Sequence, residues 1–158
     1  MHEVEMMERT LILIKPDAIQ RARIGDIIGR FEKRGMKIVG MKMLRMAKEL
    51  SKEHYPHLVS KPFYPDLENF MTHHPIVAMV LEGKECVEVV RGMMGPTNSR
   101  KAAPGTIRGD LSMSTSRNII HGSDSVETAE KEIKRFFKPE ELYDYNFEFA
   151  EYVYAADE

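Results

Sequence analysis

The chain has 158 residues, of which 42% are hydrophobic and 30% are charged, and its 23 basic and 25 acidic residues leave a formal net charge of -2. This is the composition of an ordinary globular domain, and the small net charge argues against a general nucleic-acid-binding or membrane-binding protein. We expect one domain over residues 1–158. The lone Cys86, the lack of a secretory signal and the lack of an apolar run of about 20 residues predict a cytoplasmic protein that does not span a membrane.

The first half of the chain alternates strand and helix patterns. The aliphatic stretch TLILIKPD predicts a buried strand that ends at Pro16, so that Lys15 lies at the carboxyl end of the strand. Helical spacing predicts a helix over residues 19–34, which ends at Gly35, a residue free to adopt positive φ. The elements expected next are a strand, two short helices, a strand and a helix, at residues 36–44, 47–59, 62–74, 75–83 and 87–94.

Apolar periodicity then fails over residues 95–117. This segment is longer than most connections in compact domains, which predicts a functional loop. A short strand, Asn118 to Ile120, and a helix over residues 125–137 follow it, and a tail with alternating aromatic residues occupies residues 146–158. The order of these elements predicts a ferredoxin-like α+β fold, a split βαβ arrangement in which helices pack on a four-stranded antiparallel sheet.

The last predicted helix places a histidine and a carboxylate close together. Asp124 is the expected N-cap and Glu127 its partner in a capping box, so His121 lies just before a helix N-terminus, which favours a bound phosphate. Glu132 lies on the helix face that points to the core, where a carboxylate needs a hydrogen-bond partner, and His121 enters from the direction in which helical side chains lean. We therefore expect a hydrogen bond that leaves one imidazole nitrogen free as a nucleophile. On local pattern alone, a structural core histidine is an equal alternative.

Positive charge is concentrated in the long loop. It carries four basic residues, Arg100, Lys101, Arg108 and Arg117, against one acid, Asp110. The predicted sheet could bring Lys15 and Arg91 to the same edge. Cations, hydroxyl groups and glycines without apolar periodicity suit phosphate oxygens, and a solvated basic loop is the alternative.

Other chemistries find little support. The sequence has no P-loop, no dinucleotide-binding glycine motif and no nucleophile-elbow serine. The pairs His54, His57 and His73, His74 lack further ligands at convincing spacing, so we expect surface histidines and no protein metal site.

Six motifs occur in an order and spacing that resemble the nucleoside diphosphate kinase family from about Arg9 to Tyr154. They are IKPDAIQR, EHY, KPF, RGMMGPTN, PGTIRGD and NIIHGSDSVETAEKEI. The resemblance implies a ferredoxin-like subunit that transfers the terminal phosphate of a nucleoside triphosphate to a nucleoside diphosphate. It implies a ping-pong route through a phosphohistidine, with broad base specificity. His121 matches the phosphorylated histidine, Glu132 the glutamate that binds its other ring nitrogen, and Ser123 a serine beside that glutamate.

The resemblance also implies the nucleotide contacts. Positions around the phosphates match Tyr55, Arg91, Thr97 and Arg108, and positions near the sugar and the transferred phosphate match Lys15 and Asn118. Phe63 matches the aromatic residue that stacks on the base, and Leu67 fits the other apolar edge of the slot. Thr115 stands where many relatives carry a valine against the base, and Leu58 where some carry a histidine, a role that we do not transfer to His57.

Partners and cofactors follow from the same resemblance. Mg²⁺ is expected to bind mainly through the nucleotide phosphates, since no carboxylate cage is visible in the sequence. A homo-oligomer is implied, most often a hexamer. Two other functions stay open from the residues alone: a nucleic-acid-binding module, for which an RNP1-like pattern and basic charge are missing, and a phosphocarrier charged by a protein donor, which would not need Phe63.

Overall fold

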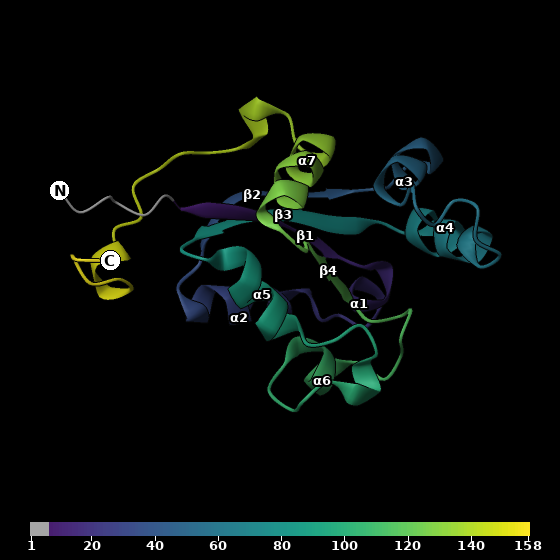
Figure 1. Ribbon diagram of the computed structural model, residues 1–158, viewed down its shortest axis with the longest axis horizontal. Coiled ribbons are helices and arrows are strands. Elements are labelled where there is room, and N and C mark those ends of the chain that lie inside the picture. Colours follow the sequence, from purple (N-terminus) through teal and green to yellow (C-terminus); the bar gives the residue numbers. More distant parts are fainter. Residues whose placement is uncertain (1–6) are drawn as a thin grey trace.

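The computed structural model describes residues 7–158, which contain a four-stranded antiparallel sheet (Figure 1). The strands are β1 (Glu8–Ile14), β2 (Lys37–Leu44), β3 (Ile76–Gly83) and β4 (Ile120–Gly122), and their order across the sheet is β2-β3-β1-β4. In the register, Leu13 of β1 lies opposite Ala78 of β3 on one side and opposite His121 of β4 on the other. This order confirms the predicted ferredoxin-like fold.

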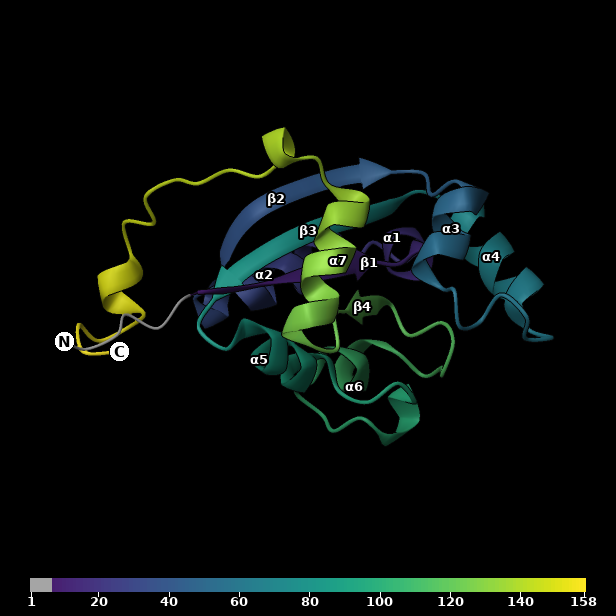
Figure 2. The same ribbon diagram turned by 45° about the horizontal axis from the view of Figure 1, so that its top comes forward.

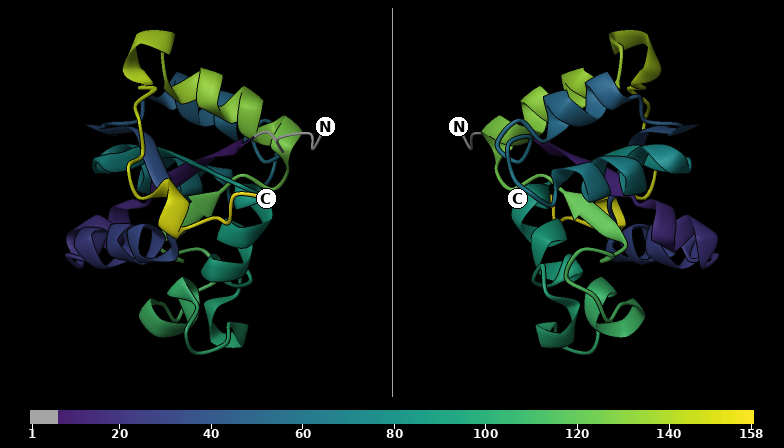
Figure 3. Two further views of the ribbon diagram at one scale, coloured as in Figure 1. Left: turned by 90° about the vertical axis from the view of Figure 1, so that its left-hand side faces the viewer. Right: turned by 90° about the vertical axis from the view of Figure 1, so that its right-hand side faces the viewer.

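Helices cover both faces of the sheet (Figure 3). Ile12 and Ile14 point into a core with α2 (Ile24–Arg34) and α5 (Cys86–Met94), whereas Leu11 and Leu13 point into a second core with α7 (Val126–Phe136). Residues opposite each other on neighbouring strands share a face. His121, opposite Leu13, therefore points to the side of the sheet that α7 covers.

The predicted helix over residues 19–34 is wrong in its first part, because two helices occupy this region. The chain forms α1 (Pro16–Gln20) directly after β1, turns at Ala22 with a φ of 56°, and begins α2 at Ile24. A positive φ at a residue with a Cβ breaks the helical path, so Arg23 starts a new helix as its N-cap. The predicted stop at Gly35 is confirmed by its φ of 96°.

Two segments extend from the sheet (Figure 2). Helices α3 (Lys48–His54) and α4 (Tyr64–His73) lie at the end at which β2 finishes, and residues 95–117 contain a 3-10 turn, Ser99–Lys101, and the short helix α6 (Ile107–Leu111). The long loop is therefore more regular than its lack of periodicity indicates. Thr106 caps α6 by accepting a hydrogen bond from the Gly109 backbone N–H.

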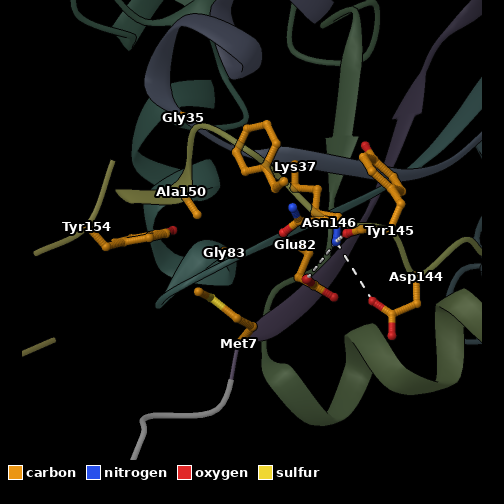
Figure 4. Close-up of a pocket in the computed structure, with 11 residues that line it drawn as sticks. Met7, Gly35, Lys37, Glu82, Gly83, Asp144, Tyr145, Asn146, Ala150 and Tyr154 are labelled. Carbon is orange, nitrogen blue, oxygen red and sulfur yellow. Dashed lines mark hydrogen bonds and ion pairs between the residues drawn. The ribbon is translucent and has the colours of Figure 1, made fainter. Parts of the chain in front are cut away.

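The C-terminal segment follows the outer strand β2 and includes two 3-10 turns, Pro139–Glu141 and Ala150–Tyr152. The Tyr143 N–H donates to the Val39 carbonyl, and the Tyr154 hydroxyl accepts from the Lys84 N–H. A cavity of about 440 Å³ lies between this segment and the end of the sheet at which β1 and β2 begin and β3 finishes (Figure 4). Its cation, Lys37, is already balanced by Glu82 and Asp144 at 3.9 and 3.8 Å, and it contains none of the predicted site residues.

Within residues 7–158, no helix combines the length and the apolar character that crossing a membrane requires.

Candidate active site

A strained turn presents His121 at the edge of the sheet. Ile119, two residues before it, is fully buried and has a φ of 64°, which is costly for a β-branched residue. The turn is held from two sides: the Ile119 N–H donates to the Asp17 carboxylate at 3.0 Å, and its carbonyl accepts from the Lys15 N–H at 2.9 Å. These bonds tie the start of β4 to the end of β1. They therefore determine where His121 emerges.

The capping prediction for α7 is wrong by one residue. Ser125, not Asp124, is the N-cap, and its hydroxyl accepts from the Thr128 N–H at 3.1 Å. A serine hydroxyl satisfies the free N–H groups of a first turn as well as a carboxylate does, so an acidic residue is not a sufficient sign of the N-cap. The helix face is as predicted, because Glu132 is only 5% exposed.

Glu132 lies at the centre of a compact hydrogen-bond network. Its two oxygens lie 3.2 and 3.1 Å from Nε2 of His121. The Ser123 hydroxyl donates to the same carboxylate at 2.6 Å and accepts from the Leu11 backbone N–H at 3.2 Å. The contact predicted between the helix carboxylate and the imidazole is thus present, and Ser123 links it to the central strand.

This network determines which nitrogen of the His121 imidazole carries the hydrogen. Burial disfavours the charged form of Glu132, but hydrogen bonds from His121 and Ser123 outweigh this and lower the pKa of the carboxyl to about 2. An ionised carboxylate only accepts hydrogen bonds, so Nε2 of His121 carries the hydrogen. Nδ1 points away from the carboxylate, and in the form of the ring that carries one hydrogen it keeps a free lone pair, as a nucleophilic histidine needs.

His54 was predicted to be a surface histidine, and this prediction is wrong. It ends α3 with a side chain only 1% exposed, and its ring packs edge-on against His121 with centroids 4.8 Å apart. Nδ1 lies 3.1 Å from Nη1 of Arg135, and Nε2 is buried without a hydrogen-bond partner among residues 7–158. Burial, followed by repulsion from His121, lowers the pKa of His54 to about 3, so the ring is neutral. The short, mostly polar α3 offers no local sign of this burial.

The predicted cations converge on the loop side of His121. The Lys15 ammonium donates to the Asn118 side chain and to the Ser116 carbonyl, both at 2.9 Å. Burial, with Arg108 and Arg117 adding repulsion against the opposing effect of Asp17, lowers the pKa of Lys15 to about 8.

Arg108 has a structural role in the long loop, in addition to any contact with a ligand. Its guanidinium donates to the backbone carbonyls of Asn118, Gly95 and Ile120, at 3.2, 2.9 and 2.6 Å. Burial, with repulsion from Arg91, lowers its pKa to about 10, so the group stays charged at neutral pH. Arg108 therefore places positive charge beside β4 and also holds the two ends of the long loop together. Spacing alone did not indicate this second role.

The remaining predicted residues surround this centre. Asn118 donates to the carbonyls of Thr97 and Thr115, at 3.1 and 2.9 Å, and both threonine residues are exposed. Arg91, also exposed, contacts the Gly122 carbonyl at 3.4 Å, and the half-buried Tyr55 packs against His54 with ring centroids 4.7 Å apart.

Phe63 and Leu67 lie apart from this network, at the start of α4. Phe63 is 52% exposed, and Leu67 is partly buried against the core under α7. Sequence reasoning did not single out Phe70 on the same helix. Its ring lies 4.8 Å from the Arg117 guanidinium and 5.8 Å from the Lys15 ammonium, so it supports two cations of the site.

Comparison with known proteins identifies the family. The family model described as nucleoside diphosphate kinase matches residues 8–142. The chain belongs to the nucleoside diphosphate kinase family. A curated member from Rhodopirellula baltica is 51% identical over 152 residues, which cover 96% of this chain and 100% of that protein. A member from Pyrococcus horikoshii is 56% identical over 141 residues, which cover 87% and 90%.

Solved structures of the family share the fold. The nucleoside diphosphate kinase of Halobacterium salinarum, solved in complex with CDP, superposes with a TM-score of 0.90 at 45% identity and covers 93% of this chain and 98% of its own. That of Encephalitozoon cuniculi has a TM-score of 0.88 at 44% identity, with 93% and 99% covered. The resemblance stated from the motifs is thereby confirmed. As a nucleoside diphosphate kinase, the chain is a nucleotide-binding phosphotransferase.

One group of side chains around His121 has the spacing of metal ligands. One ligand atom each from His54, His121 and Glu132 lies within 4.8 Å of the others. The group does not suit Mg²⁺, which prefers an octahedral set of oxygens, and the guanidinium of Arg135 stands 3.1 Å from one of the nitrogens. The Glu132 oxygens are also already occupied by His121 and Ser123.

Proposed function

We propose that this chain transfers the terminal phosphate of a nucleoside triphosphate to a nucleoside diphosphate by a ping-pong route, with His121 as the phosphorylated residue. The observation that carries the proposal is the pairing of Nε2 of His121 with the ionised carboxylate of Glu132, at 3.1 Å. That pairing orients the ring and leaves Nδ1 unprotonated. It suits a residue that must accept a phosphoryl group and give it up again.

In the first half-reaction, Nδ1 of His121 attacks the γ-phosphorus in line. The new N–P bond forms as the bond from phosphorus to the bridging β–γ oxygen breaks, and the nucleoside diphosphate leaves with the electron pair. Glu132 balances the positive charge that the phosphorylated ring acquires, because its carboxylate stays bonded to Nε2–H. A second nucleoside diphosphate attacks the same phosphorus and restores neutral His121.

Positive charge for the phosphate oxygens comes from Lys15, Arg91 and Arg108. Phosphoryl transfer needs mainly positioning and compensation of charge, and the three cations meet beside β4. Tyr55, Thr97 and Asn118 are proposed as further contacts around the phosphates and the sugar. The contact of Asn118 with Thr97 and the packing of Tyr55 against His54 support this proposal.

The base is proposed to stack on Phe63, with Leu67 and Thr115 at the edges of the slot. The exposure of Phe63 supports this, because a half-exposed aromatic ring on a helix is free to receive a planar ligand. Stacking discriminates weakly between bases, so we propose broad base specificity.

Mg²⁺ is proposed to bind mainly through the nucleotide phosphates. Among the residues that the structure describes, the group with metal-ligand spacing near His121 is nitrogen-rich and does not suit this ion. When bound to the phosphates, Mg²⁺ would neutralise part of their charge. The residues of this chain orient the phosphates around it.

Assembly and location complete the proposal. The family resemblance favours a homohexamer. The outer strand β2 carries Met41 and Met43, which are 54% and 59% exposed, and such side chains suit a subunit contact. Sedimentation of the purified protein tests this, since a monomer at micromolar concentration would contradict it.

A cytoplasmic location rests on the lone Cys86, a buried thiol that forms no internal disulfide.

The chemistry is tested with ATP labelled at the γ-phosphate. The parent protein is expected to take up acid-labile label and to release it to several different diphosphates, whereas His121→Ala takes up none. His73→Ala is the matched control, because His73 ends α4 outside the network. Equal labelling of His121→Ala and the parent would refute the assignment.

A further inference from the structure

His54 is held in one tautomer by a neighbour on α7. Its Nδ1 lies 3.1 Å from Nη1 of Arg135, and a guanidinium donates hydrogen bonds but accepts none. Nδ1 must therefore be the unprotonated nitrogen of a neutral ring, and the hydrogen is on Nε2. That Nε2 is buried and has no acceptor within residues 7–158. The protein thus keeps a tautomer that leaves one of its own donors unsatisfied.

The alternative tautomer would have a partner close by. Nδ1 of His54 lies 3.7 Å from Oε2 of Glu132, the oxygen that also receives Nε2–H of His121 at 3.1 Å. With its hydrogen on Nδ1, His54 would need to move about 0.5–0.8 Å closer to that oxygen to donate to it. Oε2 would then accept from both imidazoles, and sharing that oxygen would weaken the contact that orients His121.

We propose that Arg135 is a positioning residue for phosphotransfer: by donating to Nδ1 of His54 it holds the tautomer that cannot bind Glu132, and so reserves Glu132 for His121. Two of the three side chains come from one helix, since Glu132 and Arg135 are one turn apart on α7, and both contact His54 at the end of α3. Arg135 acts at one remove, through His54, on the Glu132 to His121 contact. The consequence for the rate rests on the proposed function of His121, whereas the tautomer itself does not.

Four variants separate this role from simple packing. Arg135→Met keeps the alkyl chain and removes the donor, and Arg135→Lys keeps a donor. The double variant Arg135→Met, His54→Phe removes the competing imidazole as well but keeps an aromatic ring beside Tyr55 and Phe136. Lys134→Met is the control for loss of a cation from α7, because Lys134 is exposed.

The tautomer is measured without nucleotide, by solid-state NMR of protein labelled with ¹⁵N in its histidine rings. His54 is assigned by the signals that disappear in His54→Phe. We expect an unprotonated Nδ1 in the parent and in Arg135→Lys, and at least partial protonation of Nδ1 in Arg135→Met. An unchanged Nδ1 signal in Arg135→Met would overturn the proposal, whatever reaction the protein catalyses.

The consequence is measured by single-turnover labelling with ATP and by the Kd of ADP. We expect Arg135→Met to form phosphohistidine about five- to tenfold more slowly, which corresponds to the weakening of one hydrogen bond, at an unchanged Kd. Arg135→Lys and the double variant should recover most of the rate. A double variant as slow as Arg135→Met would show that Arg135 does not act through His54. Failure of the parent to label would instead contradict the proposed function and leave the tautomer result standing.

Discussion

Replacement of Glu132 by glutamine tests the centre of the proposed mechanism. The amide has nearly the same shape as the carboxylate. Its carbonyl oxygen can still accept from Nε2–H of His121 and from the Ser123 hydroxyl, which lies 2.6 Å from Glu132 in the parent protein. The negative charge is what the variant loses. A hydrogen bond to a charged group contributes about 1.5–3 kcal/mol and one between neutral groups about 0.5–1.5 kcal/mol, so the loss is about 1–2 kcal/mol.

That loss affects the transition state more than the bound nucleotide. Positive charge develops on the His121 ring only as the N–P bond forms, and Glu132 contacts the ring, not the cations proposed to hold the phosphates. We therefore expect Glu132→Gln to slow phosphohistidine formation roughly 5- to 30-fold while the Kd of ADP stays within about twofold.

The assay is rapid-quench labelling with ATP labelled at the γ-phosphate, at saturating nucleotide, beside calorimetric titration with ADP. Glu130→Gln is the matched control, because Glu130 lies on the exposed face of the same helix. An unchanged labelling rate would remove Glu132 from the mechanism. A slower rate accompanied by an equally weakened Kd would show that the carboxylate acts on binding instead.

Three further predictions concern pH, packing and base stacking. The pKa of His54 is lowered to about 3 in the folded state, whereas an ordinary histidine in the unfolded chain has a pKa near 6.5. As the pH falls, the unfolded state therefore binds a proton first. The free energy of unfolding should fall by up to about 1.4 kcal/mol per pH unit as the pH drops from 6.5 toward 3. Urea unfolding at pH 7.5 and pH 5 should show a smaller fall for His54→Phe, and an equal fall would contradict the burial argument. Gly122→Ala should destabilise the protein by about 1–3 kcal/mol, because its Cβ would lie 2.5 Å from Sδ of Met94. Gly92→Ala is the control and should not destabilise the protein, because a Cβ at Gly92 would meet no atom within 4 Å. Equal urea midpoints for the two variants would refute this prediction. Phe63→Ala should raise the Kd of ADP about 5- to 150-fold at unchanged stability, and an unchanged Kd would exclude stacking on this ring.

Local pattern was informative wherever one residue type determines the local backbone. Pro16 placed Lys15 at the end of a strand, and Gly35 marked the end of α2, because each restricts or permits particular φ values. Helical spacing placed Glu132 on the buried face of α7. The N-cap of α7 was predicted one residue too early, at Asp124, because the hydroxyl of Ser125 accepts hydrogen bonds from free N–H groups as a carboxylate does.

Local pattern failed wherever a distant segment decides. His54 ends a short helix of mostly polar residues, and its burial comes from packing against Phe136 and His121. The donors of Arg108 go to backbone carbonyls that only the folded loop brings within reach. Composition identified a basic loop, but not that one of its cations holds the loop closed.

The sequence by itself determined the order of the four strands and of most helices, the family resemblance and the helix face on which Glu132 lies. These depend on short-range periodicity, on backbone-restricting residues and on motifs that are read in order along the chain. The sequence did not show the break between α1 and α2 or the short helix α6 within the long loop. Only the tertiary structure decided that His54 and Arg135, 81 residues apart in sequence, meet beside His121 and Glu132. The physical reason is that periodicity reports which face of an element is buried, whereas the side chain that it meets there depends on how the sheet and α7 pack.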